Sequence, residues 1–139
     1  NNTWEEILED YQIDFYRIRK REDIKRVQRG QIVLLTINLL TELKREMKKL
    51  LRIRCQKVML IFDESDAITN GSSKRTKAML SVFRKCRYKV LATGTLTRNN
   101  VVEAAPQLEL LYNNSIHYLA KNEWIYRFKN GQMEKNRNF

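Results

Sequence analysis

The stretch that decides the fold is an apolar run followed directly by acidic residues, and it reads Val58-Met59-Leu60-Ile61-Phe62-Asp63-Glu64-Ser65-Asp66. A continuous apolar run of this length is typical of a strand that is buried on both faces of a parallel sheet. The carboxylates that follow it repel one another unless a cation or hydrogen-bond donors lie beside them. Ligands of parallel sheets bind at the carboxyl ends of the strands. The end of this strand is therefore the first candidate site.

Apolar runs and helical apolar stripes alternate on either side of this strand. The runs Ile32–Ile37 and Lys89–Ala92 predict two more strands. We expect an α/β fold in which these three strands are adjacent, parallel and buried, with the parallel sheet flanked by helices on both faces. The other predicted elements are a strand in Tyr11–Ile18, a short helix over Arg21–Gln28, and helices from Asn38 to about Leu51, from about Ser73 to Lys85, and over Val101–Tyr112 with an interruption near Pro106.

Beyond Tyr112 the periodicity weakens. The segment Trp124–Phe128, followed by Asn130 and Gly131, fits a strand and a tight turn. We expect a single domain over residues 1–139, with its core in about 11–112 and a peripheral extension in 113–139. Because the sequence does not begin with Met, we expect it to be a piece of a longer protein.

The charge balance favours a polyanionic partner. The chain has 27 Lys and Arg against 16 Asp and Glu, a formal net charge of +11. Cations placed on phosphates release condensed counterions, so such an excess favours nucleic acid. For any single lysine, a solvated helix face is the alternative interpretation. The charge does not indicate which nucleic acid is bound.

Composition also excludes several classes of protein. An apolar share of 42% is enough for a hydrophobic core, and no apolar run approaches the roughly 20 residues that cross a bilayer. The possible zinc ligands Cys55, Cys86 and His117 are scattered, which excludes a structural zinc site and a disulfide framework. No signal peptide is visible. We expect a cytoplasmic or nucleoid-associated protein, or a nuclear one if its source is eukaryotic.

A second strand end strengthens the first candidate site. The run Lys89–Ala92 leads into Thr93-Gly94-Thr95, about thirty residues after the acidic box. A glycine allows close backbone approach, and threonine hydroxyls can hydrogen-bond to carboxylates on a neighbouring strand. Alone, this is an ordinary loop. With a strand before each motif and a helix between them, the pair is much more specific.

This pair of motifs resembles the superfamily 2 helicases and the Swi/Snf-type DNA translocases. The acidic box Asp63–Asp66 (DESD) is similar to their Walker B or DEAD/DEAH box, motif II. The TGT sequence at 93–95, with Asn99 and Glu103 after it, is similar to motif III of the Swi/Snf-type branch. Residues Gln31–Leu40 resemble the strand and helix that carry motif Ib. The resemblance covers about residues 11–112.

Four departures from the family pattern qualify this resemblance. Leu96 stands where the Swi/Snf-type branch prefers Pro, and Asp66 stands where it more often has His. The chain has no G-x-x-x-x-G-K-[ST] sequence, because its four glycines are isolated. No arginine-finger motif of a second lobe is recognisable. The resemblance therefore implies the C-terminal part of a first RecA-like lobe, without its P-loop segment.

The resemblance also implies roles for individual residues. Asp63 would hold Mg²⁺ through water, and Glu64 would orient or activate the hydrolytic water. Asp66 would hydrogen-bond to Thr93 or Thr95 in the coupling motif that also includes Gly94. The candidate contacts to a nucleic-acid backbone are Thr36, Asn38 and Arg98.

Cofactors and partners follow from the same resemblance. Mg²⁺ and ATP belong to the full-length protein, and we expect neither to be bound to this piece. We expect nucleic acid as a partner, DNA rather than RNA, together with the missing P-loop segment and a second RecA-like lobe. No membrane partner is expected.

Three functions stay open from the sequence. The leading one is a fragment of an ATP-dependent helicase or translocase. The second is a non-catalytic nucleic-acid-binding α/β domain whose acidic box is incidental. The third is a metal-dependent nuclease built on Asp63, Glu64 and Asp66, although nucleases usually gather carboxylates from several elements. A G-K-[ST] loop upstream of Asn1 in the full-length protein would favour the first.

Overall fold

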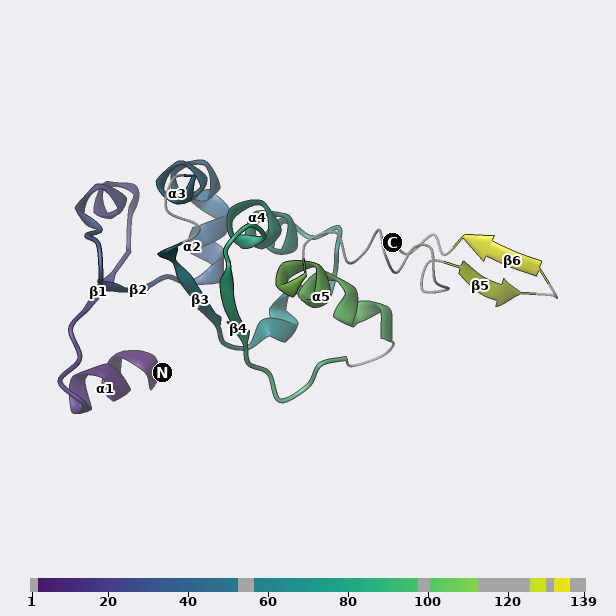
Figure 1. The fold of residues 1–139 in the computed structure, drawn as a ribbon, viewed down its shortest axis with the longest axis horizontal. Coiled ribbons are helices and arrows are strands. Elements are labelled where there is room, and N and C mark those ends of the chain that lie inside the picture. Colours follow the sequence, from purple (N-terminus) through teal and green to yellow (C-terminus); the bar gives the residue numbers. More distant parts are fainter. Residues whose placement is uncertain (1–2, 53–56, 98–100, 113–125, 130–131, 136–139) are drawn as a thin grey trace.

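The computed structural model describes residues 3–52, 57–97, 101–112, 126–129 and 132–135. Helices and short parallel strands alternate through residue 112, and an antiparallel hairpin follows (Figure 1). In chain order the elements are α1 (Thr3–Asp10), β1 (Phe15–Arg17), η1 (Arg21–Arg26), β2 (Ile32–Leu34), α2 (Ile37–Glu42), α3 (Lys44–Leu51), β3 (Met59–Phe62), η3 (Ser65–Ile68), α4 (Lys74–Phe83), β4 (Tyr88–Leu91), η4 (Val101–Ala104), α5 (Ala105–Leu111), β5 (Tyr126–Lys129) and β6 (Gln132–Lys135).

Strands β3 and β4 form the parallel pair from which both candidate motifs emerge. Their register aligns Met59 with Tyr88 and Phe62 with Leu91. The connection between them is α4, and its first turn is capped by Ser73, whose hydroxyl oxygen accepts a hydrogen bond from the Thr76 backbone N–H at 3.1 Å. The structure thus confirms the predicted strand, helix and strand in this region.

Strands β1 and β2 form a second parallel pair, which confirms a strand within Ile32–Ile37, but its predicted length, burial and place beside β3 were wrong. Among the described residues, β2 is hydrogen-bonded to β1 and not to β3, it ends at Leu34, and Ile32 is 42% exposed. The strand is short because Thr36 caps α2, its hydroxyl oxygen accepting from the Leu39 backbone N–H at 3.3 Å. The capping preference of threonine outweighs the β-propensity of the run.

The helix predicted from Asn38 to Leu51 is two helices, α2 and α3, divided at Leu43. The Thr41 hydroxyl donates to the Ile37 carbonyl at 2.8 Å, a bond to the preceding turn that bends helices. The predicted apolar stripe is nevertheless buried on both helices, through Leu40, Leu43, Met47 and Leu51.

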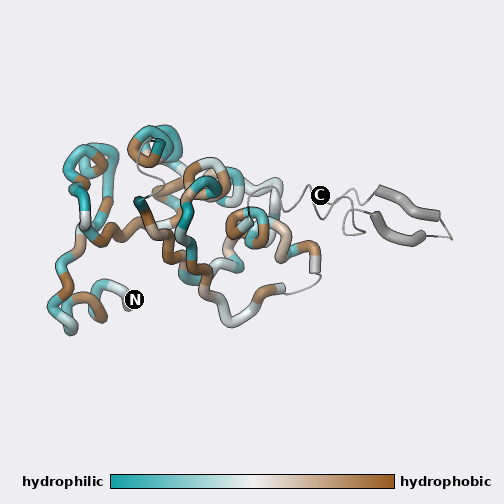
Figure 2. The backbone as a smooth tube through the Cα atoms, viewed as in Figure 1, coloured by the Kyte–Doolittle hydropathy of each residue, from teal (hydrophilic) through white to brown (hydrophobic). Residues whose placement is uncertain are grey.

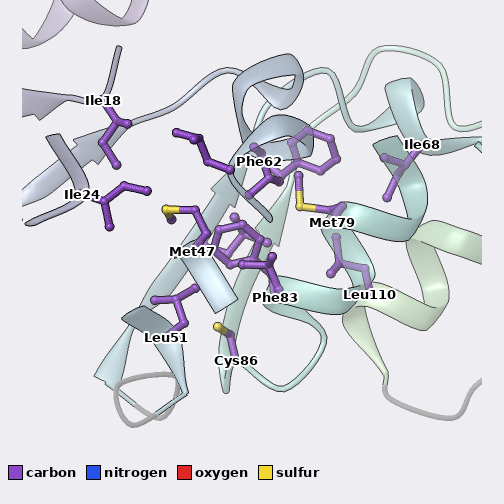
Figure 3. Close-up of a cluster of buried hydrophobic side chains, with 14 residues drawn as sticks. Ile18, Ile24, Met47, Leu51, Phe62, Ile68, Met79, Phe83, Cys86 and Leu110 are labelled. Carbon is purple, nitrogen blue, oxygen red and sulfur yellow. The ribbon is translucent and has the colours of Figure 1, made fainter. Parts of the chain in front are cut away.

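The hydrophobic core lies on one face of the β3–β4 pair. Leu60 and Phe62 point into it, where they join Met79 and Phe83 of α4 and Leu110 of α5. Figure 3 shows Phe62, Met79, Phe83 and Leu110 in one cluster that also includes Met47, Leu51 and Cys86. The cluster joins α2, α3, α4 and α5 to the sheet, so the β3–β4 pair is positioned by all four helices.

The other face of the β3–β4 pair is exposed. The prediction that these strands are buried on both faces was therefore wrong for this face. Met59, Ile61, Tyr88 and Val90 are 57%, 56%, 50% and 45% exposed. Successive side chains of a strand point to opposite faces, and the helices named above pack on the Leu60 and Phe62 side. Figure 2 shows the strongly hydrophobic residues of β3 as a brown segment.

The structure has the predicted helix break at Pro106 and a strand pair near the C-terminus. Pro106 lies in the first turn of α5, directly after η4, which confirms the predicted interruption. Strands β5 and β6 form an antiparallel pair, while Asn130 and Gly131 of the predicted turn lie outside the described residues. None of the helices in the described part of the chain is long and apolar enough to cross a membrane.

We predict that Leu110→Ala lowers the free energy of unfolding by about 2–5 kcal/mol, because Leu110 is fully buried and the truncation leaves a cavity. Tyr112→Ala is the control from the end of the same helix, and it should change that free energy by less than about 0.5 kcal/mol because Tyr112 is 69% exposed. Urea unfolding followed by circular dichroism measures both. Equal losses in the two variants would contradict the position of the core.

Candidate functional site

Asp63 is the first residue after β3, and its carboxylate is held by donors from two parts of the chain. One oxygen, Oδ1, accepts from the Glu64 backbone N–H at 2.9 Å. The other, Oδ2, accepts from the indole N–H of Trp4 in α1 at 2.8 Å. The side chain is exposed, so it can still contact a ligand. Sequence reasoning missed this contact, because nothing in the sequence pairs Trp4 with a residue so far along the chain.

Glu64 adopts a strained backbone conformation. Its φ is 50° and its ψ is 50°, in the left-handed region that favours glycine. Its side chain is exposed. Strain of this kind persists only where the surrounding structure fixes the backbone, and it is found preferentially at functional sites. Glu64 shares this positive φ with one other described non-glycine residue, Gln12 in the turn after α1, and of the two only Glu64 lies in the acidic box.

The TGT loop follows β4 and lies beside the acidic box. The Thr93 hydroxyl is 3.4 Å from Asp66 Oδ1 and 3.1 Å from the Thr95 carbonyl oxygen, and it also accepts from the Thr95 backbone N–H at 3.1 Å. The Thr93 hydroxyl therefore closes its own turn and contacts Asp66 only at the limit of hydrogen-bonding distance. A Cβ atom at Gly94 would meet nothing within 4 Å, so the described fold itself does not require glycine there.

A buried glutamine, which sequence reasoning missed, connects the two loops. Gln107 of α5 accepts from the Ser65 hydroxyl at 2.7 Å and donates to the Leu96 carbonyl oxygen at 3.1 Å. Its side chain is almost completely buried. The signal for it was a polar residue within the otherwise apolar turn around Ala105 and Leu108, because buried polar groups need specific partners.

The acidic box does not form a metal cage. Among the described residues, no group of three or more His, Cys, Asp or Glu side chains is arranged to hold a metal ion. Asp63 is exposed and already oriented by two donors. One such carboxylate fits a cation held mainly by water and by phosphate oxygens, as Mg²⁺ is in nucleotide sites. It does not fit a cation enclosed by protein ligands.

Two of the three residues predicted to contact nucleic acid share a shallow pocket. This pocket has a volume of about 340 Å³ and is lined by Arg17, Ile18, Arg19, Thr36, Asn38, Leu39 and Glu42. Thr36 and Asn38 are exposed, at the end of β2 and the start of α2. The structure adds two arginines from the end of β1. Arg98, the third predicted contact, lies outside the described residues.

The loop that carries Arg19 is held by a buried carboxylate. Asp23 accepts from the backbone N–H groups of Arg19 and Lys20 at 2.9 and 3.1 Å. The hydrogen bond from Arg19 is the main reason why the pKa of Asp23 lies below its ordinary value. Arg17 is ion-paired with Glu5, whereas the side chain of Arg19 is exposed.

Residues 4–138 of the chain match the family model of the SNF2-related domain. The chain belongs to the SNF2-related domain family. Neither the comparison with curated proteins nor the comparison with solved structures returned a match. Membership confirms the resemblance to Swi/Snf-type superfamily 2 proteins and the RecA-like α/β class of the fold. Proteins of this family are ATP-dependent helicases and translocases that act on nucleic acid.

The SNF2-related domain extends beyond the 11–112 region that carries the sequence motifs. Its match begins at Trp4, so it includes helix α1 and the residue that hydrogen-bonds to Asp63. Its end, at residue 138, includes the β5–β6 hairpin. Both segments therefore belong to the family region.

We predict that Asp23→Asn flattens the acid side of the stability curve. The lowered pKa of Asp23 means that its carboxylate stabilises the fold above its unfolded pKa and that this contribution is lost as the pH falls through the folded value. Urea unfolding between pH 7 and pH 3 should show a steeper loss for wild type than for Asp23→Asn below about pH 4. Asp14→Asn, which replaces an exposed carboxyl group, is the matched control. Parallel curves for wild type and Asp23→Asn would contradict the assigned contacts.

Proposed function

We propose that this SNF2-related domain is part of an ATP-dependent helicase or Swi/Snf-type DNA translocase, to which it supplies a Walker B box (DESD) and a coupling motif (TGT). One observation carries the proposal: the two motifs leave adjacent parallel strands side by side. The Ser65 backbone N–H donates to the Ala92 carbonyl at 3.0 Å, directly between the motifs. Asp66 and Thr93 approach to 3.4 Å just beyond this point.

In this proposal the exposed carboxylates at the end of β3 have distinct roles. Asp63, oriented by Trp4 and by the Glu64 backbone, holds Mg²⁺ through water. Glu64 orients or deprotonates the attacking water. When bound, the metal neutralises charge that develops on the transferred phosphoryl group. Asp66 and Thr93 connect this region to the loop that follows β4.

The nucleotide site needs parts that this chain does not supply, and we propose that a P-loop segment and a second lobe of the full-length protein supply them. The exposed face of the β3–β4 pair supports the first of these partners. Its apolar side chains, Met59, Ile61, Tyr88 and Val90, lie on a parallel sheet, and such sheets are ordinarily covered on both faces. Burying this face would remove apolar surface from water and so stabilise the assembled lobe.

We propose further that the pocket at the ends of β1 and β2 contacts a nucleic-acid backbone. Arg19 offers an exposed guanidinium, Thr36 a hydroxyl and Asn38 a side-chain amide, which are the groups that hydrogen-bond to phosphate oxygens. Glu42 lines the same pocket and disfavours phosphate next to it. The positive charge of the chain favours DNA or RNA generally, and family membership in the Swi/Snf-type branch favours DNA.

The first test concerns hydrolysis. In the full-length protein, Glu64→Gln should reduce ATP turnover by orders of magnitude while nucleotide binding survives, because only activation of water is lost. Phosphate release and binding of a fluorescent nucleotide measure the two properties separately. The 139-residue chain alone should show no appreciable turnover, because phosphates are held mainly by P-loop amides and lysine.

Glu9→Gln is the matched control, because it makes the same change at an exposed glutamate in α1. It should leave turnover at the wild-type rate. Wild-type turnover in Glu64→Gln would remove Glu64 from the catalytic role. If binding of nucleic acid persisted without any ATP hydrolysis by the full-length protein, the non-catalytic binding domain would replace this proposal.

The second test concerns nucleic acid. The chain should bind a fluorescent single strand and a duplex weakly and without sequence preference, and log affinity should fall linearly with log salt. The double variant Arg19→Ala with Asn38→Ala should bind the single strand and the duplex more weakly. The slope of log affinity against log salt should become smaller in magnitude by about one, because one cation is removed. The control is Lys48→Ala with Lys49→Ala, on the exposed surface of α3. A larger loss in the control would move the contact to α3, and affinity that does not depend on salt would exclude phosphate contacts.

A further inference from the structure

We propose that Gln107 is a positioning residue that fixes the backbone of Glu64 and joins the acidic box to the TGT loop. It acts on Glu64 through Ser65 and on the loop through the Leu96 carbonyl. This inference rests on the proposed function only in the role it gives to Glu64. The contacts themselves belong to the fold of the chain.

Gln107 bridges the two loops from a buried position. Ser65 and Gln107 are 0% and 2% exposed, so their polar atoms have no access to bulk water. The glutamine Oε1 accepts from the Ser65 hydroxyl at 2.7 Å, and its Nε2 donates to the Leu96 carbonyl at 3.1 Å. A neutral side-chain amide is the group that offers an acceptor and a donor at once. Neither leucine nor an ionised glutamate satisfies both partners.

The two loops also meet in a direct contact between the side chains of Asp66 and Thr93. Asp66 and Thr93 are 3.4 Å apart, and the Thr93 hydroxyl has a closer acceptor in the Thr95 carbonyl at 3.1 Å. Both hydrogen bonds of Gln107 are shorter than the Asp66–Thr93 contact; the bond to Ser65 is buried and the bond to Leu96 is partly buried. Gln107 therefore adds a side-chain bridge between the loops to the backbone hydrogen bond from Ser65 to Ala92.

Glu64 is held in its strained conformation by the residues around it. Its neighbours are fixed on both sides: the Glu64 backbone N–H donates to Asp63, while Ser65 is held by Ala92 through its N–H and by Gln107 through its hydroxyl. Between these fixed points, Glu64 has a φ of 50°. A left-handed residue other than glycine persists only where its surroundings fix it. Removing the Gln107 bridge therefore allows the Glu64 backbone to relax and its side chain to change direction.

Gln107 is itself held in place by the packing of α5. Helix α5 packs against α4 and η3 through buried residues on either side of the glutamine, Ala105 and Leu110. An ion pair between Glu109 and Arg84, the residue that caps the end of α4, has an N–O distance of 3.3 Å and holds the same helix. Because α5 is held in this way, the Gln107 side chain fixes the positions of the loops that hydrogen-bond to it.

The test measures the strain at residue 64 without requiring activity. In the 139-residue chain, Glu64→Gly should unfold at a higher temperature than Glu64→Ala, by roughly 2–5 °C, because only alanine is penalised in the left-handed region. In the Gln107→Leu background this advantage of glycine should disappear or reverse. A purely structural role of Gln107 would lower both melting temperatures equally and preserve the difference.

Two further variants keep the test decisive. Ser65→Ala removes the hydroxyl that donates to Gln107, so it should also abolish the higher melting temperature of Glu64→Gly relative to Glu64→Ala. This variant replaces Gln107→Leu in the test if Gln107→Leu does not fold. Gln28→Leu makes the same change at an exposed glutamine and should leave the advantage intact. An advantage of equal size in wild type, Gln107→Leu and Ser65→Ala would overturn the proposal. Because no ATP is used, this outcome is independent of whether Glu64→Gln changes hydrolysis.

Discussion

The rest of the structure depends on the parallel pairing of β3 with β4 and its extension beyond the strands. The Ala92 backbone N–H donates to the Phe62 carbonyl at 2.9 Å, and the Ser65 N–H donates to the Ala92 carbonyl at 3.0 Å. These bonds carry the sheet register past Phe62 into the acidic box. Two loops that are about thirty residues apart in sequence are thereby held side by side. The candidate site exists only if these two loops are adjacent, whichever side chains they carry.

The core explains why the pair is held rigidly although it has only two strands. An isolated two-stranded unit is marginal in water, and here one face is packed by α2, α3, α4 and α5. The buried residues Ser65, Gln107 and Ile68 extend that packing beneath the acidic box. The opposite face stays exposed and apolar. The same sheet is thus well supported where the motifs emerge and incomplete where the proposed P-loop segment would lie.

Sequence reasoning succeeded where one local pattern decided the outcome. The apolar run before Asp63, the Ser73-capped helix and the interruption near Pro106 each depend on short-range propensity, and the structure has all three. It failed where long-range packing decided. Nothing in Ile32–Ile37 distinguishes a central strand from a short edge strand ended by a capping threonine. Alternate exposure along β3 depends on which helices are present, and an apolar run does not report that.

In the candidate site, too, the sequence predicted the arrangement of the strand ends but not the contacts between distant residues. The proximity of the DESD box to the TGT loop could be predicted because strand ends of a parallel sheet meet at one edge. The contacts of Trp4 and Gln107 could not, because each joins residues far apart in the chain through a single side chain. A polar residue in an apolar helix turn signals a buried partner but not its identity. The strained φ of Glu64 has no sequence signature at all, since glutamate is not a residue that favours it.

The measurement that tests this account most directly is the scalar coupling across the hydrogen bond between the Ser65 amide nitrogen and the Ala92 carbonyl carbon, in the isotopically labelled chain. The account predicts that this coupling is present, together with slow exchange of the Ser65 amide proton, because the β3–β4 pairing continues between the two motifs. Absence of the coupling with rapid exchange of that proton would show that the loops are not joined, and the proposed site would have no structural basis.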